Sequence, residues 1–285
     1  MFEILHKDIL APTVHRFVIR APFIAPKRKP GNFIMLRIDR NGERIPLTLV
    51  DSNVADGTIT LIVQGIGKST RQLLTMNAGD SLQDVVGPLG NPTPILTGQT
   101  VVCVGGGVGT AELYPITKAL REAGNTVYAI IGGRTKDLVI LENEMRAVTT
   151  DTFVTTDDGS YGRKGLVTDQ LKDLIDSTSG VTAVYAIGPL PMMKAVSAVT
   201  RPYGIHTVVS LNAIMVDGTG MCGGCRVSVN GQMKFACVDG PEFDGHQVDF
   251  DELIMRNRGY AGDERASLER FEHPADHECR MGGSK

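Results

Sequence analysis

The chain has 285 residues, of which 42% are hydrophobic and 21% are charged, and its formal net charge at pH 7 is −3. This composition is typical of a globular protein with more than one domain, and the slightly acidic balance argues against a general nucleic-acid binder. No apolar run reaches the roughly 18 residues of a membrane span, and the opening MFEILHKDIL lacks a secretory pattern, so we expect a cytoplasmic protein.

Residues 1–97 are predicted to be all-β. Short apolar or alternating runs such as VHRFVIR, NFIMLRI and TITLIVQ are separated by turn signals, among them Asn41-Gly42 and Asp56-Gly57. Many short strands at this spacing favour a small barrel or a sandwich.

Residues 98–208 change to an alternation of strands and helices. TVVCVGG, TVYAIIGG and TAVYAIGP are continuous apolar runs, as expected for strands that are buried on both faces. AELYPITKALREAG, LVILENEMRAV and GLVTDQLKDLID have helical patterns, and Pro115 is expected to kink the first of them or to lie in an irregular first part. The alternation predicts a parallel sheet with right-handed crossovers.

A glycine loop joins the first strand of this segment to its first helix. Its members are Gly105, Gly106, Gly107, Gly109 and Thr110. Such a loop lets backbone N–H groups approach a pyrophosphate at a helix N-terminus, so we predict a dinucleotide site, with a ligand-free tight turn as the alternative. The next strand ends near Arg134 and Lys136, which suit either a 2′-phosphate or solvent, so NAD and NADP both stay open.

Three of the five cysteines cluster in residues 209–285, where Cys222 and Cys225 are followed by Cys237. An odd number of cysteines in a reducing compartment favours metal binding over disulfides. The spacing matches the last three positions of the plant-type iron–sulfur pattern C-x4-C-x2-C…C, and Asp217 occupies the first position. A carboxylate is also an anionic iron ligand, so we predict a [2Fe–2S] cluster on these four residues.

Two alternatives stay open at the cluster. Cys279, in the polar segment HECRM, is a candidate ligand in place of Asp217. The three clustered cysteines with His246 also have the composition of a tetrahedral zinc site, which would make the chain a zinc-stapled nucleotide-binding module. Cys103 lies in an apolar run and is expected to be a core residue, and the final RMGGSK is expected to be disordered.

The order of these segments resembles the ferredoxin-reductase-like flavoproteins. The resemblance implies a FAD-binding β-barrel at residues 1–97, an NAD-binding α/β domain at 98–208, and a small [2Fe–2S] domain with a tail at 209–285. Two groups share this order: the electron-transfer subunit of dihydroorotate dehydrogenase B, and the small subunit of the electron-bifurcating NADH-dependent ferredoxin:NADP oxidoreductase, also described as sulfide dehydrogenase. The segment CVDGPEF resembles both groups, while Asp217 favours the second.

The flavin residues are assigned through this resemblance. The segment RIPLTL resembles the family's flavin motif, which implies that Arg44 pairs with the diphosphate and that the strand after it contacts the flavin ring. The segment GIGKST resembles the family's flavin-phosphate loop at a helix N-terminus. The implied FAD contacts are Arg44, Pro46, Leu47, Thr48, Gly67, Lys68, Ser69 and Thr70.

The nicotinamide residues are assigned in the same way. Gly188 and Pro189 lie in AIGPLPMM, which resembles the family's signature near the nicotinamide, although Ile187 replaces the common cysteine. Asp157, after another strand, is a candidate nucleotide contact, with a solvated turn as the alternative.

The resemblance implies an oxidoreductase subunit in which NADH docks on the glycine loop, hydride passes to FAD, and electrons leave singly through the cluster. We expect no catalytic acid or base, because hydride transfer depends on positioning. The chain has no second cysteine cluster, so the resemblance implies a heterodimer with a larger subunit that carries a further flavin and [4Fe–4S] centres. Ferredoxin and NADP would be reached through that partner.

Overall fold

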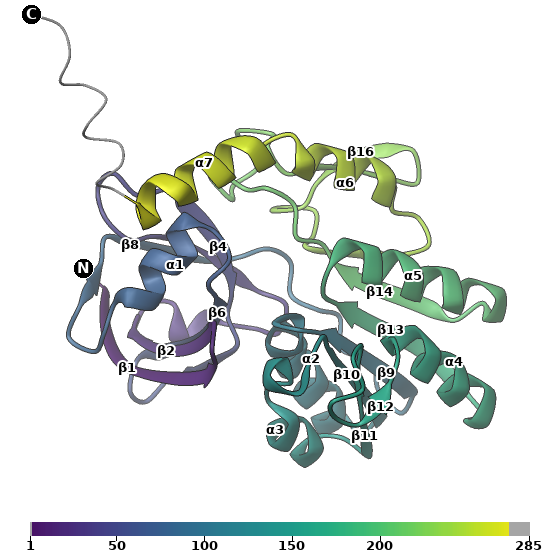
Figure 1. Cartoon of the computed structure of the whole chain (residues 1–285). Helices are drawn as coiled ribbons and strands as arrows, with labels where there is room; N and C mark the ends of the chain where they lie inside the picture. The colour runs from purple at the N-terminus through teal and green to yellow at the C-terminus, as the bar shows by residue number, and fades with distance from the viewer. Residues whose placement is uncertain (1, 274–285) are drawn as a thin grey trace, which may run out of the picture.

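The computed structural model describes residues 2–273, so Cys279 and the final RMGGSK lie outside the described residues. The strands of the N-terminal part form one lobe and the parallel sheet with its helices forms a second (Figure 1). The last two helices run across both lobes in the same view. Within the described residues, no helix is both long enough and apolar enough to cross a membrane.

The N-terminal lobe is built from two antiparallel sheets, ordered β5-β6-β2-β1-β7 and β4-β3-β8. Phe17, Ile34 and Leu61 are fully buried between the sheets, because the alternating runs direct every second side chain inward. Its elements are β1 (Phe2–Ala11), β2 (Val14–Arg20), η1 (Ala25–Lys27), β3 (Phe33–Arg37), β4 (Arg44–Thr48), β5 (Asp51–Asn53), β6 (Thr58–Gln64), α1 (Lys68–Thr75), β7 (Ser81–Leu82) and β8 (Asp84–Leu89).

The second lobe contains a sheet in the order β12-β11-β10-β9-β13-β14-β17. All its pairings are parallel except the one between β14 and β17. The chain leaves β9 toward β10 on one side and later returns to β13 on the other side. β9 and β13 therefore meet at the point where the strand order reverses, and ligands bind there in open α/β sheets.

The bounds of these elements agree with the periodic segments of the sequence. They are β9 (Thr100–Gly106), α2 (Gly109–Glu122), β10 (Thr126–Gly133), η2 (Lys136–Leu138), α3 (Glu142–Ala147), β11 (Asp151–Thr156), β12 (Arg163–Lys164), α4 (Val167–Ser177), β13 (Val181–Ile187), α5 (Leu190–Thr200), η3 (Arg201–Tyr203) and β14 (His206–Ser210). Cys103 is fully buried, as expected.

Two local expectations need correction or refinement. α2 is helical from Gly109 through Pro115, so the irregular first part considered for this helix is not observed. Of the segment LVILENEMRAV only Glu142–Ala147 is α-helical. The apolar part before it is non-helical because Ile140 and Leu141 are buried against Val50 and Ile62 of the barrel, and this contact between lobes overrides the local helical pattern.

The C-terminal segment packs on both lobes. It forms a hairpin, adds an antiparallel strand to the nucleotide sheet, and ends in two helices, the second of which lies against α1 (Figure 1). Its elements are β15 (Arg226–Val229), β16 (Gln232–Phe235), β17 (Glu242–Asp244), α6 (Phe250–Arg258) and α7 (Ala261–Glu272). Glu272 forms an ion pair with Arg71, in which the carboxylate oxygen and the guanidinium nitrogen are 2.7 Å apart.

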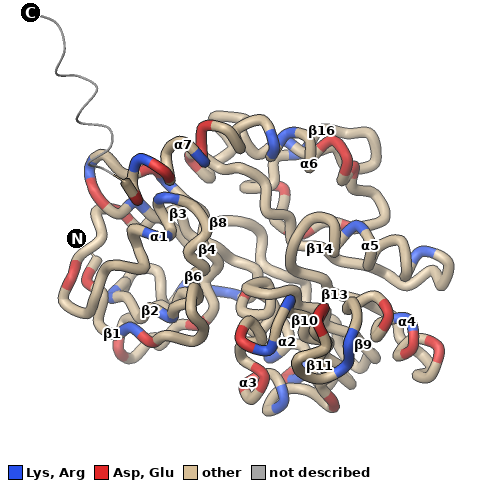
Figure 2. The backbone as a smooth tube through the Cα atoms, viewed as in Figure 1, with Lys and Arg blue, Asp and Glu red and all other residues tan. Residues whose placement is uncertain are grey.

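Basic and acidic residues are interspersed over both lobes and along the last two helices (Figure 2). This distribution fits the small net charge of −3.

Candidate flavin, nucleotide and iron–sulfur sites

A cavity of about 750 Å³ lies between the two lobes, and we call it the interdomain cavity. The barrel lines it with Gln64 and Ile66, just before α1. The nucleotide lobe lines it with the glycine loop after β9 and with Gly188 and Pro189 after β13. The two loops at the reversal of the strand order therefore face the barrel across this space.

The glycine loop is shaped by contact with the loop after β13. A Cβ on Gly106 would lie 2.4 Å from the Met192 sulfur, and a Cβ on Gly109 would lie 2.3 Å from the carbonyl oxygen of Ile187. A Cβ on Gly105 would lie 2.8 Å from the Thr110 hydroxyl oxygen. These positions therefore require glycine for packing.

Gly107 requires glycine for a different reason. Its φ of +57° lies in the left-handed region, and no atom lies within 4 Å of a Cβ built there. The backbone at Gly107 is thus open to the cavity, which fits the close approach of a phosphate group to a glycine loop.

The charged residues after β10 and β11 divide into two environments. Asp157 is exposed and lines the interdomain cavity together with Arg134. The ammonium of Lys136 instead lies 5.5 Å from the ring centre of Tyr161, outside the cavity lining. Of the two cations considered for a 2′-phosphate, only Arg134 faces the dinucleotide site.

The candidate flavin strand is β4, an edge strand of the sheet β4-β3-β8. Arg44 begins β4 and is exposed, while Pro46, Leu47 and Thr48 are half-buried. β4 pairs with β3, and Pro46 lies directly opposite Met35. The exposed guanidinium can reach an anion, and the rest of the strand offers a partly apolar surface to a ring.

The N-terminus of α1 supplies the candidate phosphate loop. Gly67 caps the helix, and a Cβ there would meet no atom within 4 Å. The Thr70 hydroxyl oxygen accepts hydrogen bonds from the backbone N–H groups of Ile66 and Gly67, at 3.0 and 3.1 Å. The Ser69 hydroxyl donates to Glu43 at 2.8 Å, so both hydroxyls shape the loop, while the space before Gly67 is open.

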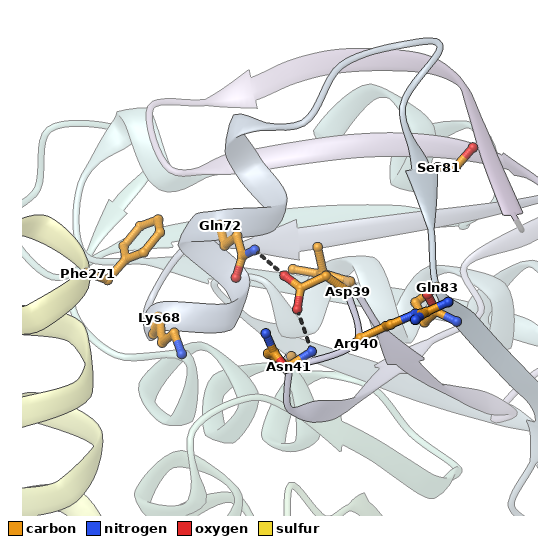
Figure 3. A pocket seen from close by; sticks show the side chains of 10 residues that line it. Asp39, Arg40, Asn41, Lys68, Gln72, Ser81, Gln83 and Phe271 are labelled. Carbon is orange, nitrogen blue, oxygen red and sulfur yellow. Dashed lines mark hydrogen bonds between the residues drawn. The ribbon is translucent and has the colours of Figure 1, made fainter. Parts of the chain in front are cut away.

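A second cavity of about 640 Å³ is lined in part by α1 (Figure 3). Lys68 and Gln72 of α1 line it, together with the turn between β3 and β4 and with Phe271 of α7. Asp39 in that turn accepts hydrogen bonds from the Gln72 amide and from the backbone N–H of Asn41, both at 2.8 Å. These bonds hold the pKa of Asp39 below its usual value, with the Gln72 bond as the larger cause.

The candidate cluster ligands are arranged as two pairs. The sulfurs of Cys225 and Cys237 are 3.2 Å apart, and both residues are buried. The Asp217 carboxylate accepts the backbone N–H groups of Thr219 and Cys222, at 2.7 and 2.9 Å. A two-iron cluster takes two protein ligands on each iron, so two pairs match its needs.

The same residues are less suited to a site for a single metal ion, such as zinc. Within residues 2–273 no three His, Cys, Asp or Glu side chains are grouped so that they could hold one ion. The His246 ring, which the zinc alternative requires, instead places Nε2 2.9 Å from the Thr200 hydroxyl of the nucleotide lobe. This arrangement favours a cluster over a Cys3His zinc site.

The charge state of these ligands also suits iron. Hydrogen bonds from Thr219 and, to a smaller extent, Cys222 lower the pKa of Asp217, so its carboxylate is an anion at neutral pH. Burial and the adjacent Cys225 raise the pKa of Cys237 to about 12. A bound cation reverses such a shift, because it stabilises the thiolate directly.

One ionisable cavity residue was not predicted from the sequence. Glu112, in the first turn of α2, lines the interdomain cavity, and the Thr48 side chain is a polar neighbour of its carboxyl group. The available signal was an acidic residue in the helix turn that follows a glycine loop. Such residues are common at helix N-termini, so the sequence alone did not separate a buried group from a solvated one.

Comparisons with known proteins identify the domains and the family. Residues 103–198 match the oxidoreductase NAD-binding domain, and residues 212–249 match the iron–sulfur cluster binding domain of dihydroorotate dehydrogenase B. The dihydroorotate dehydrogenase B (NAD(+)) electron transfer subunit homolog of Thermotoga maritima is 48% identical over 269 residues, which are 94% of this chain and 95% of that protein. The chain belongs to the dihydroorotate dehydrogenase B electron-transfer subunit family.

Two further relatives support this membership. The probable electron transfer subunit of dihydroorotate dehydrogenase B from Methanocella arvoryzae is 36% identical over 77% of this chain and 81% of its own length. A chain from the structure of NADH-dependent reduced ferredoxin-NADP oxidoreductase, described in connection with flavin-based electron bifurcation, is 47% identical. It has a TM-score of 0.90 and covers 95% of this chain and 98% of that chain.

These findings confirm the family resemblance and the fold class. The chain is an oxidoreductase subunit with an NAD-binding domain, and its iron–sulfur domain contains all four predicted ligands between residues 212 and 249. The predicted combination of a β-lobe, a parallel nucleotide-binding sheet and a C-terminal iron–sulfur segment is the architecture observed.

Proposed function

We propose that this chain is the electron-transfer subunit of an NADH-dependent ferredoxin:NADP oxidoreductase, and that it moves electrons between NAD(H), FAD and a [2Fe–2S] cluster. The similarity to the bifurcating oxidoreductase extends over 95% of the chain, and Asp217 occupies the first ligand position, which favours that group. The proposal assigns NAD(H) to the glycine loop, Asp157, Gly188 and Pro189.

FAD is assigned to β4 and to the N-terminus of α1. The open space before Gly67 and the exposed Arg44 fit a diphosphate, and the half-buried Pro46, Leu47 and Thr48 fit a flavin ring. When bound there, FAD would accept two electrons as hydride and pass them on singly. The residues of the chain would position the two rings.

The observation that carries this function is the contact between the cluster loop and the barrel. A Cβ on Gly218, next to the candidate ligand Asp217, would lie 2.7 Å from the Met35 side chain and 2.9 Å from that of Leu89. Met35 in turn pairs with Pro46 on the candidate flavin strand. The loop at Gly218 thus packs on β3, the strand that pairs directly with the proposed flavin strand β4.

A larger partner subunit is part of the proposal. Within the described residues the cysteines other than the buried Cys103 are Cys222, Cys225 and Cys237, which with Asp217 supply the ligands of a single candidate cluster. Bifurcation requires further flavin and [4Fe–4S] centres, which we assign to the partner of a heterodimer, together with the ferredoxin and NADP reactions. The second candidate is the electron-transfer subunit of dihydroorotate dehydrogenase B, which the iron–sulfur domain match favours.

The test is anaerobic purification of the native complex, with its flavin, iron, sulfide and partner identified together. NADH should bleach the flavin, and a [2Fe–2S] electron paramagnetic resonance signal should follow. A partner that carries FMN and oxidises dihydroorotate would select the second candidate. His246→Ala should leave the iron content unchanged, whereas a zinc-containing, iron-free protein would refute both candidates.

A further inference from the structure

Glu112 is a carboxylic acid that lies between the proposed nicotinamide site and the proposed flavin strand. It lies in the first turn of α2, directly after the glycine loop, and lines the interdomain cavity. On the barrel side its polar neighbour is Thr48, the last residue of the proposed flavin strand. No other carboxyl group in the described part of the chain combines this cavity position with contact to β4.

The surroundings of Glu112 contain little charge. β9, β10 and β13, which pack against α2, have no Asp, Glu, Lys, Arg or His along their strands. β4 contributes Arg44, but at the opposite end of the strand from Thr48. The other charged residues of the cavity lining are Arg134 and Asp157, on the loops after β10 and β11.

The remaining nearby charges are already paired. α3 also packs on α2, and its acids Glu142 and Glu144 bind Arg146 and Arg16, at 2.8 and 3.0 Å. Arg28 of the barrel donates to the carbonyl oxygens that follow β4. Within residues 2–273, Arg16, Arg28 and Arg146 thus form ion pairs with other carboxylates and not with Glu112.

Burial is therefore the dominant influence on this carboxyl group. It raises the pKa of Glu112 to about 7, and the Thr48 side chain opposes the shift only in part. Glu112 is half-buried, and the exposed part faces the cavity. A small change of charge in the cavity is then enough to change its protonation near neutral pH.

We propose that Glu112 takes up a proton when the flavin proposed beside Thr48 is reduced, and releases it when that flavin is reoxidised. This inference rests on the proposed function. Hydride carries two electrons and one proton from NADH to the flavin, which leaves one added negative charge. The Glu112 carboxylate then binds a second proton, supplied by water, because a nearby like charge disfavours the carboxylate. On reoxidation two electrons leave through the cluster and both protons return to water.

The test is the pH dependence of the flavin midpoint potential in the holoprotein. For a two-electron couple each proton taken up shifts the midpoint by about 30 mV per pH unit. Below about pH 7 Glu112 is protonated in both redox states and contributes nothing. Above about pH 7 the wild-type slope should steepen by about 30 mV per pH unit, whereas Glu112→Gln should lack this steepening.

Glu242→Gln is the matched control. Glu242 is also a buried glutamate whose pKa burial raises to about 7, but it bonds Thr93 at 2.6 Å and does not line the interdomain cavity. Its replacement should leave the steepening intact. Titration of the flavin ring itself would persist in Glu112→Gln, so equal slopes in wild type and that variant would overturn the proposal.

A second measurement requires no mutant that might lose its fold. Redox difference infrared spectra of the wild type, above about pH 7, should show a protonated carboxyl band that grows on flavin reduction and shifts in D2O. Absence of this band would also overturn the proposal. A protein that binds no flavin, or whose flavin NADH does not reduce, would refute the proposed function instead, so the two failures are distinguishable.

Discussion

Gly109→Ala is expected to separate the two loops that form the nucleotide site. The new Cβ would lie 2.3 Å from the carbonyl oxygen and 2.7 Å from the carbonyl carbon of Ile187, and 2.9 Å from Cα of Gly188. All three neighbours are backbone atoms at the end of β13, so no side-chain rotation relieves the contact. Either the start of α2 or the loop at Gly188 must move.

The size of the effect follows from the overlap. An ordinary contact of a Cβ begins at about 3.4 Å, so the backbone must shift by about 1 Å. Overpacking of this kind costs about 1–3 kcal/mol of folding free energy. A displacement of about 1 Å in a positioning element can also lower a reaction rate by about 100-fold. The proposed flavin strand β4 belongs to the other lobe, so flavin content should be retained.

Urea unfolding measures the stability loss, and stopped-flow bleaching of the flavin by NADH measures the rate. Gly262→Ala is the control, because that helical glycine in α7 has no atom within 4 Å of a Cβ. It should gain up to about 1 kcal/mol from the higher helix propensity of alanine and should keep the wild-type rate. If Gly109→Ala matched the wild type in both stability and bleaching rate, the proposed contact between the loops would be wrong.

Three further outcomes are expected. Asp217→Cys should retain a [2Fe–2S] cluster with an altered midpoint potential and electron paramagnetic resonance spectrum, because a soft sulfur replaces a hard oxygen; identical spectra would exclude Asp217 as a ligand. Burial raises the folded-state pKa of Glu242 from its ordinary value of 4.5 to about 7, so its contribution to stability is complete below pH 4.5 and is lost as pH rises toward 7. Between pH 4.5 and 7 the wild type should therefore lose on the order of 3 kcal/mol of unfolding free energy through Glu242, and Glu242→Gln should not show this loss in urea unfolding. The same pH dependence in wild type and variant would contradict this assignment. Arg71→Ala should cost under about 1 kcal/mol, because its ion pair with Glu272 is partly solvated, and a loss of several kcal/mol would mean that α7 docks mainly through this pair.

Local patterns in the sequence predicted most of the elements, and they are the basis of the proposed cofactor motifs. The continuous apolar runs of β9, β10 and β13 indicate strands buried on both faces, and the glycine loop lies between a strand and a helix. The spacing from Asp217 to Cys225 is informative because these ligands belong to one short loop. Each of these features depends on residues that are close together in the chain.

Contacts between distant residues were decided only by the tertiary structure. Ile140 and Leu141, before α3, are buried in the contact between the lobes, and α3 begins only after them. Gly218 reaches Met35, and Thr48 reaches Glu112, through packing of segments from different lobes. Periodicity describes the face that one element buries, but not which element of the other lobe covers it. The relation between cluster, flavin strand and acid therefore follows from the packing of the lobes, for which the sequence has no local signal.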